Sequence, residues 1–207
     1  MEIIDEKVRT VKNNSLWRTL GATNHTEKDR QNEDYYATDP QAAEMLLEIE
    51  DIDKSVPIWE CSSGEDHLAN VFKDHGYKVR TSDIVKRTET TEILDFLSED
   101  ITDWDGNIIT NPPYKLAVQF VEKAMSILHE GNKCIMFLKL QFMEGKSRRK
   151  LFEKYPPKTI WVSSSRILCA KNGDFEKMIA GGGGALAYAF YIWQKGYKGD
   201  TILKWFN

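Results

Sequence analysis

The sequence has few cysteines and no long apolar run, and these absences exclude several classes of protein. Three cysteines in 207 residues are an odd number, lie far apart and show no CxxC spacing, so we expect neither a disulfide framework nor a cysteine-rich zinc site. No apolar stretch approaches the roughly 18 residues that a membrane span needs. Residues 1–6 provide neither the basic nor the apolar part of a signal peptide. We therefore expect a cytoplasmic protein that uses no membrane and no metal.

The remaining composition predicts a globular protein. Hydrophobic residues make up 41% of the chain and aromatic residues 11%, which excludes a disordered chain because both can form a sizeable core. The length favours one domain. Residues 1–34 are polar and mixed in charge, with no sustained hydrophobic period. We expect residues 1–34 to form a polar arm and residues 35–207 to form a single domain.

The charge is distributed unevenly along the chain. The net charge is −4, but residues 1–138 carry −12 and residues 139–207 carry +8. Such a split indicates a polyanion-facing surface in the basic part, although a solvated lysine-rich face would give the same count. Basic residues are densest between residues 139 and 158. The residues that we expect to contact nucleic-acid phosphates are Lys139, Lys146, Arg148, Arg149 and Lys150.

Short apolar runs alternate with helical patterns along most of the chain. The runs that are typical of strands lie at residues 56–60, 77–82, 107–110, 133–138, 159–163 and 186–194. The patterns that are typical of helices begin at Pro40, His67, Leu116 and Gly145. This alternation predicts an α/β fold with a mostly parallel sheet and helices on both faces.

Unusual residues follow three of the predicted strands, where ligands bind in open α/β sheets. The small-residue turn from Glu60 to Gly64 lets the backbone approach a ligand closely, although it is also typical of a plain tight connection. It is neither a GxGxxG turn nor a P-loop. Asp83 has the position of an acid that accepts ribose hydroxyls, or of a helix cap. Asp95 and Phe96 place an acid beside an aromatic ring, which alone is weak evidence for adenine binding.

The tetrad Asn111-Pro112-Pro113-Tyr114 is the strongest single signal. Two prolines directly after a buried strand remove two backbone donors and stiffen the turn. A purely structural turn would more often be Asn-Gly or Asp-Gly. The tetrad presents an amide oxygen, rigidly held carbonyl groups and an aromatic face. These groups are suited to holding a flat molecule that carries an amino group.

These motifs together resemble the S-adenosylmethionine-dependent amino-methyltransferases. The tetrad after a Glu-Cys-Ser-x-Gly turn carries the resemblance, and the segment 34–40 is similar to the cofactor segment of DNA N6-adenine methyltransferases. The segments 137–146 and 187–193 are similar to the small phage and prophage enzymes of that group. The resemblance implies a Rossmann-like methyltransferase sheet of seven mostly parallel strands, with an antiparallel C-terminal strand. It also implies S-adenosylmethionine as cofactor, DNA as partner and the N6 atom of a flipped adenine as target.

The resemblance also implies a role for each motif residue. The residues that it places around the cofactor are Tyr36, Thr38, Pro40, Glu60, Cys61, Ser62, Gly64, Asp83, Asp95, Phe96 and Asn111. Within this set, Asp83 would bind the ribose hydroxyls, and Asp95 and Phe96 would hold the adenine. The residues that it makes catalytic are Asn111, Pro112, Pro113 and Tyr114. Asn111 and Pro112 would accept the two amino hydrogens of the target base, and Tyr114 would stack on it.

The sequence leaves the substrate and the site preference open. A methyltransferase that acts on RNA or on a protein glutamine would carry the same tetrad, and a catalytically idle nucleic-acid-binding module would keep the same fold. Many sequence-specific relatives add a sizeable target-recognition region, whereas here the sequence reaches Asn207 soon after the apparent last strand. We expect base-specific contacts to come from loops within residues 143–185, to be weak, or to need a partner. The sequence does not predict an oligomeric state.

Overall fold

The computed structural model describes residues 36–165, 167, 169–171, 176 and 186–207. The predicted polar arm, residues 1–34, lies outside these residues, and so does the side chain of Tyr36. None of the helices in the described part of the chain is long and apolar enough to cross a membrane.

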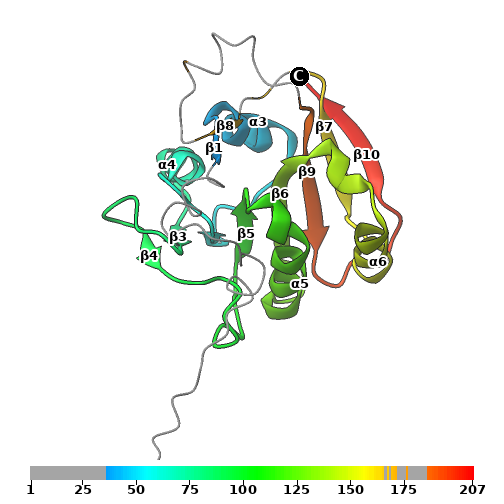
Figure 1. Ribbon diagram of the computed structural model, residues 1–207, viewed down its shortest axis with the longest axis horizontal. Helices are drawn as coiled ribbons and strands as arrows, with labels where there is room; N and C mark the ends of the chain where they lie inside the picture. The colour runs from blue at the N-terminus through cyan, green and yellow to red at the C-terminus, as the bar shows by residue number, and fades with distance from the viewer. Residues whose placement is uncertain (1–35, 166, 168, 172–175, 177–185) are drawn as a thin grey trace, which may run out of the picture.

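The central element is an eight-stranded sheet (Figure 1). Its strands are β2 (Ile58–Glu60), β3 (Val79–Asp83), β4 (Glu92–Ile93), β5 (Asn107–Thr110), β6 (Lys133–Lys139), β7 (Thr159–Ser163), β9 (Tyr188–Gln194) and β10 (Ile202–Phe206). Their order across the sheet is β10-β7-β9-β6-β5-β2-β3-β4. Only β9 runs antiparallel to its neighbours, β6 and β7. The order reverses between β5 and β2, where ligands bind in sheets of this type.

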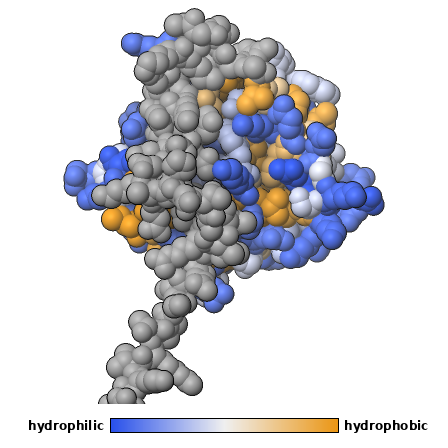
Figure 2. Space-filling model, in the orientation of Figure 1, coloured by the Kyte–Doolittle hydropathy of each residue, from blue (hydrophilic) through white to orange (hydrophobic). Residues whose placement is uncertain are grey.

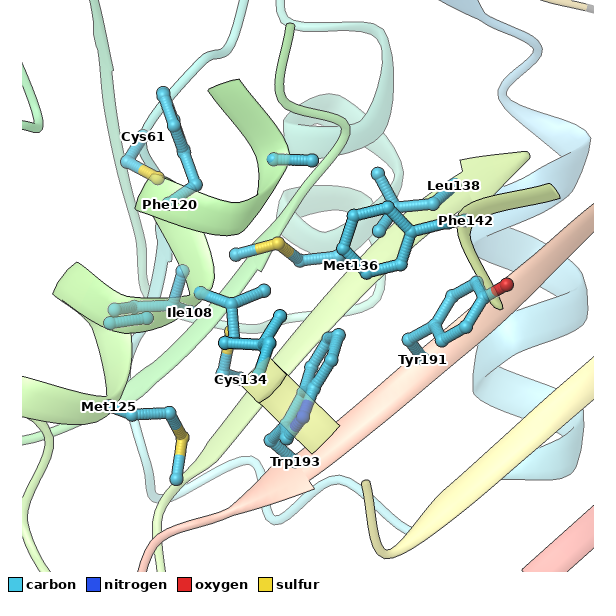
Figure 3. Packing of buried hydrophobic residues seen from close by; sticks show 14 of the residues in the cluster. Cys61, Ile108, Phe120, Met125, Cys134, Met136, Leu138, Phe142, Tyr191 and Trp193 are labelled. Atoms are coloured by element: carbon cyan, nitrogen blue, oxygen red, sulfur yellow. The ribbon is translucent and has the colours of Figure 1, made fainter. Parts of the chain in front are cut away.

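Helices cover both faces of the sheet. They are α3 (Gln41–Ile49), α4 (His67–Asp74), α5 (Ala117–Ile127) and α6 (Lys146–Lys154). Strand β6 shows the division, because successive side chains of a strand point to opposite faces. Its residues Cys134, Met136 and Leu138 pack in the cluster of α5 and α6 (Figure 3), whereas Ile135 and Phe137 pack in the cluster of α3 and α4. The sheet is therefore the middle layer of three.

The predicted fold class is confirmed, with one more strand than expected. The sheet is mostly parallel, helices cover both faces, and an antiparallel strand lies in the C-terminal part of the chain. Two strands, β4 and β10, are not among the six that the sequence pattern predicted. Strand β4 has two residues, and β10 pairs in parallel with β7 at the sheet edge. The burial of β10 explains why the sequence pattern did not predict this strand. Only Phe206 is buried, so β10 lacks the alternation of apolar and polar residues that marks a half-buried strand.

A separate two-stranded ribbon joins two distant parts of the chain. It consists of β1 (Tyr36–Thr38) and β8 (Cys169–Lys171), which pair antiparallel with Thr38 opposite Cys169. In Figure 1 the ribbon lies beside α3. Directly after β1, the Asp39 carboxylate accepts a hydrogen bond from the backbone N–H of Gln41 at 2.9 Å and so supports the start of α3. Pro40 is the N-cap residue of α3, one position before the helix begins at Gln41, and Thr38 belongs to the ribbon.

Candidate functional site

The main pocket lies at the carboxyl ends of β2, β3 and β5. These strands are parallel neighbours, so the segments that follow them converge at one edge of the sheet. The predicted residues that line the pocket are Thr38, Glu60, Cys61, Ser62, Asp83, Asp95, Phe96, Asn111, Pro112, Pro113 and Tyr114. Their individual roles stay predictions, but the structure brings them together around one space.

Of the predicted cofactor residues, Pro40 and Gly64 are not among the lining residues, and the side chain of Tyr36 lies outside the described part of the structure. Pro40 lies at the N-cap of α3, and Gly64 contributes only through its backbone. Gly64 has a φ of 56°, a left-handed conformation that glycine adopts without a steric penalty. The lining residues that the motifs did not predict are Ala37, Ser63, His67, Leu68, Ile84, Val85, Arg87, Leu97, Leu116 and Phe120. They lie beside the motifs without belonging to a recognisable pattern.

Asp83 links the turn after β2 to the loop after β3. Its Oδ2 accepts a hydrogen bond from the backbone N–H of Gly64 at 2.9 Å. Its Oδ1 accepts one from the backbone N–H of Val85 at 3.0 Å, and the Arg87 guanidinium lies 3.4 Å from the same oxygen. A carboxylate oxygen accepts about two bonds, so Oδ2 retains capacity for a ligand hydroxyl. The carboxylate is thus held rigidly at the wall of the pocket.

Asp66 holds the other side of the same loop. It is buried and has a φ of 62°, which is uncommon for a residue with a side chain. Its Oδ2 accepts hydrogen bonds from the hydroxyls of Thr88 and Thr90 at 2.8 and 2.9 Å, and its Oδ1 accepts one from Thr91 at 3.3 Å. These bonds fix the loop between β3 and β4 against the turn after β2. The wall of the pocket is therefore preorganised on this side.

Glu60 is a buried carboxyl group at the pocket wall. Burial, together with the nearby carboxylates of Asp66 and Asp83, raises the pKa of Glu60 well above its usual range. Its Oε2 is buried and has no hydrogen-bond partner. A buried polar atom without a partner is costly, so this oxygen favours a ligand that donates a hydrogen bond or carries positive charge.

Asn111 offers an unpaired acceptor to the same pocket. Its side-chain Nδ2 donates a hydrogen bond of 2.7 Å to Oγ1 of Thr38, which fixes the orientation of the amide group. The opposite atom, Oδ1, is buried and has no partner. The ribbon strand β1 thus orients the first residue of the tetrad, and a donor group in the pocket would complete its hydrogen bonding.

The ring of Tyr114 is held by neighbours from three parts of the chain. Its hydroxyl donates a hydrogen bond of 3.3 Å to the hydroxyl of Tyr188, and the Cys169 thiol lies within hydrogen-bonding reach. The Lys139 ammonium lies 4.1 Å from the centre of the ring. Burial raises the pKa of Tyr114 far above its usual value, so the phenol stays neutral. The ring is a fixed apolar wall rather than a proton donor.

Phe96 lies at the boundary between the pocket and the core. It is almost fully buried and packs edge to face on Trp59, at 5.3 Å between ring centres, and against Phe120 at 5.1 Å. It lines the pocket as the outer surface of the core. The Oδ1 atom of Asp95 accepts the backbone N–H of Leu97 at 2.9 Å, which stabilises this turn. Any contact of this segment with a ligand is therefore supported by core packing.

The predicted basic residues are not equivalent. Lys139 and Arg148 line a second hollow, which shares the Tyr114 side chain with the main pocket. Arg149 is exposed and pairs with Glu153 at 2.8 Å, and Lys146 and Lys150 are exposed on α6. Figure 2 shows hydrophilic side chains, with patches of apolar surface among them, along the edge of the molecule where α6 and β10 lie. The basic helix is thus next to the site.

The acidic and thiol groups of the site are not arranged as a metal centre. Within the described part of the chain, no group of three or more His, Cys, Asp or Glu side chains is placed to hold a metal ion. Cys61 and Cys134 are buried, and burial raises the pKa of each thiol above its usual value. They serve as apolar core residues.

Comparison with known proteins identifies the fold. No protein-family model and no curated protein matches the sequence. A Listeria monocytogenes protein described as a class I S-adenosylmethionine-dependent methyltransferase superposes with a TM-score of 0.54 and 14% identity, over 80% of this chain and 62% of that one. A type I restriction-modification methyltransferase subunit of Streptococcus thermophilus gives 0.54 and 14%, over 80% and 46%. A Lactococcus lactis protein described as a hemolysin gives 0.55 and 13%, over 81% and 91%.

These matches establish a Rossmann-like fold of the class I methyltransferase type. At identities of 11 to 14% they carry no assignment of activity, because one fold can serve different functions. The chain spans less than two thirds of the length of the Listeria and Streptococcus proteins. Function must therefore be argued from the site.

Proposed function

We propose that the protein transfers a methyl group from S-adenosylmethionine to the exocyclic N6 of adenine in DNA. The observation that carries this proposal is the buried, unpaired Oδ1 of Asn111, which a hydrogen bond from Thr38 orients. An acceptor held in this way at a rigid Pro-Pro turn is suited to an amino group. The pocket beside it supplies the space and the polar groups for the cofactor.

The residues of the main pocket fit S-adenosylmethionine. Asp83 would accept ribose hydroxyls, and the unpaired Oε2 of Glu60 would receive the ammonium group of the methionine part. The apolar residues Val85, Leu97 and Phe120 suit the adenine. When bound, S-adenosylmethionine supplies an electrophilic methyl group on a positively charged sulfur. The fold type of the structural neighbours agrees with this cofactor.

The tetrad would prepare the target amine for reaction. The exocyclic amine of adenine is a poor nucleophile, because its lone pair is delocalised into the ring. Oδ1 of Asn111 and the carbonyl oxygen of Pro112 would accept its two N–H groups and so direct the lone pair out of the ring plane. Such orientation can supply several kcal/mol of the barrier. The base must leave the helical stack to enter, and Tyr114 would compensate part of the lost stacking.

Two features support a nucleic acid as substrate. The basic residues of α6 follow β6, whose carboxyl end adjoins that of β5 and hence the tetrad. One structural neighbour is a restriction-modification methyltransferase subunit. A ring-shaped base with an exocyclic amine matches the acceptor and the flat tyrosine wall better than a flexible glutamine side chain does.

The test is methyl transfer from labelled S-adenosylmethionine to three substrates. The purified protein is incubated separately with DNA that lacks adenine methylation, with RNA and with a protein extract, and the methylated atom is identified by mass spectrometry. We expect label in DNA, on N6 of adenine. Label only in RNA or only in protein glutamine would replace the proposed substrate, and no label in any of the three would indicate an idle binding module.

Thr38→Val should slow methyl transfer more than it weakens cofactor binding. Valine has the shape of threonine but lacks the hydroxyl that orients the Asn111 amide at 2.7 Å. Loss of such a bond costs about 1–3 kcal/mol, so we expect about a tenfold lower single-turnover rate. Thr38→Ser should restore the rate. Equal effects on the rate and on the cofactor dissociation constant would show that Thr38 contacts the cofactor instead.

Cofactor binding should be linked to the ionisation of Glu60. Because the pKa of Glu60 is raised, its carboxyl group in the free protein stays protonated to higher pH than an ordinary glutamate does. A bound ammonium group favours the ionised form. Binding should therefore release a proton, and affinity should rise by up to about tenfold per pH unit until Glu60 is ionised in the free protein. Calorimetry in buffers of different ionisation enthalpy measures this release. Glu60→Gln should abolish both effects; a pH slope that persists in this variant would contradict the assignment.

A further inference from the structure

The second hollow, which shares Tyr114 with the main pocket, combines two cations with aromatic side chains. It is lined by Tyr114, Leu138, Lys139, Gln141, Phe142, Glu144, Gly145 and Arg148. Tyr114 also lines the main pocket, so the two spaces adjoin at this side chain. Lys139 and Arg148 carry positive charge into the hollow, and the exposed Glu144 is the single acid of its lining. An anion is therefore the favoured ligand.

Arg148 is built into this hollow rather than extended into solvent. Its guanidinium lies 5.4 Å from the ring centre of Phe142, and its Nη1 donates a hydrogen bond of 3.1 Å to the carbonyl oxygen of Glu144. Phe142 is itself fixed, because it packs edge to face on Tyr191 at 5.4 Å (Figure 3). The backbone of Gly145 passes close to the guanidinium, where an added Cβ would lie 3.0 Å from Nη1. The arginine is thus held in place by its neighbours.

The Nε atom of Arg148 also favours an anionic ligand. This nitrogen is buried and has no hydrogen-bond partner in the structure. Buried donors are normally paired, so an unpaired charged donor indicates that an acceptor belongs beside it. Guanidinium groups bind phosphate oxygens through several N–H groups at once, and a lysine beside them adds a point charge.

We propose that Lys139 and Arg148 form a subsite for one phosphate of the strand that carries the target base. The proposal rests on the proposed function, because it identifies the ligand of this hollow from its place beside Tyr114. A base that enters the main pocket remains joined to its own phosphates, and one of these would lie in the adjacent hollow. Arg149 would contribute only to the general attraction, since it is exposed and already paired with Glu153.

The test compares matched variants on two short strands. The strand CCCCACCCC contains adenine once and is prepared either with natural linkages or with uncharged methylphosphonates on both sides of the adenine. Binding is measured by fluorescence anisotropy of labelled strands. We expect the wild-type protein to prefer the natural strand about tenfold, as loss of a charge-assisted contact predicts.

The variants distinguish a subsite from general electrostatics. Arg148→Gln should bind the natural strand about tenfold more weakly than the wild-type protein does. Its affinity for the methylphosphonate strand should fall by less than about twofold, because coupled changes are not additive. Lys139→Gln should show the same pattern, and thermal unfolding checks that both variants fold. In the matched control Arg149→Gln, the affinities for the two strands should fall by a similar small factor. Equal losses on the two strands for Arg148→Gln, or no binding of the natural strand by the wild-type protein, would overturn the subsite.

The subsite and the proposed function fail in different ways. Strand binding with the expected pattern but without methyl transfer to any substrate would remove the enzymatic function and keep the phosphate subsite. Methyl transfer to adenine with equal losses on both strands would keep the function and remove the subsite.

Discussion

Asn111→Ala should reduce single-turnover methyl transfer by about 10² to 10³ while leaving the cofactor dissociation constant within a few-fold of its value. The amide oxygen is the buried, unpaired acceptor of the tetrad, and loss of one well-placed group that acts in the transition state typically has an effect of this size. Interactions made mainly in the transition state lower turnover, whereas contacts shared with the ground state change binding. The measurement is the rate of methyl transfer at saturating cofactor and DNA.

Two control variants make the Asn111 result specific. Asn111→Asp keeps the size and an acceptor oxygen but cannot donate to Thr38 at neutral pH, so it tests whether the orienting bond of 2.7 Å is needed. Lys115→Ala changes the residue directly after the tetrad, which does not line the pocket, and should leave the rate unchanged. A near-normal rate for Asn111→Ala would remove the tetrad from the mechanism.

Asp83→Ala should weaken S-adenosylmethionine binding by about 1.5–3 kcal/mol, which is roughly 10- to 150-fold in the dissociation constant. The carboxylate is fixed by the backbone N–H groups of Gly64 and Val85, so a ligand hydroxyl meets a preorganised acceptor. The same bonds hold the pocket wall together. Part of the loss would therefore come from the wall rather than from the ribose.

A cofactor analogue separates these two contributions. S-adenosylhomocysteine and its 2′,3′-dideoxy form are titrated by calorimetry into the wild-type protein and into Asp83→Ala. If Asp83 binds the ribose, Asp83→Ala should bind S-adenosylhomocysteine much more weakly than the wild-type protein does. The dideoxy analogue should bind the two proteins with similar affinity. If Asp83→Ala weakens the binding of both analogues by the same factor, the loss comes from the pocket wall, where Asp83 also contacts Gly64 and Arg87.

The parts of the site that follow single strands were accessible from the sequence. Glu60, Asp83 and Asn111 each lie at the end of a predicted strand or directly after it, and the carboxyl ends of neighbouring parallel strands meet at one edge. The pattern therefore predicted both the sheet and the residues around the pocket. Their chemical roles came from the resemblance of the motifs, since position alone does not specify a ligand.

The features of the site that depend on pairing of distant segments, or on which side of a helix a residue lies, could not be predicted from the sequence. Strands β1 and β8 have three residues each, too few for a periodic signal, and they pair across most of the chain. Arg148 and Arg149 are adjacent in the sequence, but successive helical residues point about 100° apart. One therefore lies in the hollow beside Tyr114 and the other in solvent. Counting charges along the chain treats the two as equal.

The ribbon of β1 and β8 is a small structural unit, separate from the large sheet, that holds part of the site. Three residue pairs hold it, outside the large sheet, and it carries Thr38 opposite Cys169. Small units of this kind open locally with much lower free energy than the core, which hydrogen exchange detects. We expect backbone amides of the ribbon to exchange faster than those of β6. On gentle heating or in dilute denaturant, the orientation of Asn111 should then be lost while the sheet remains folded.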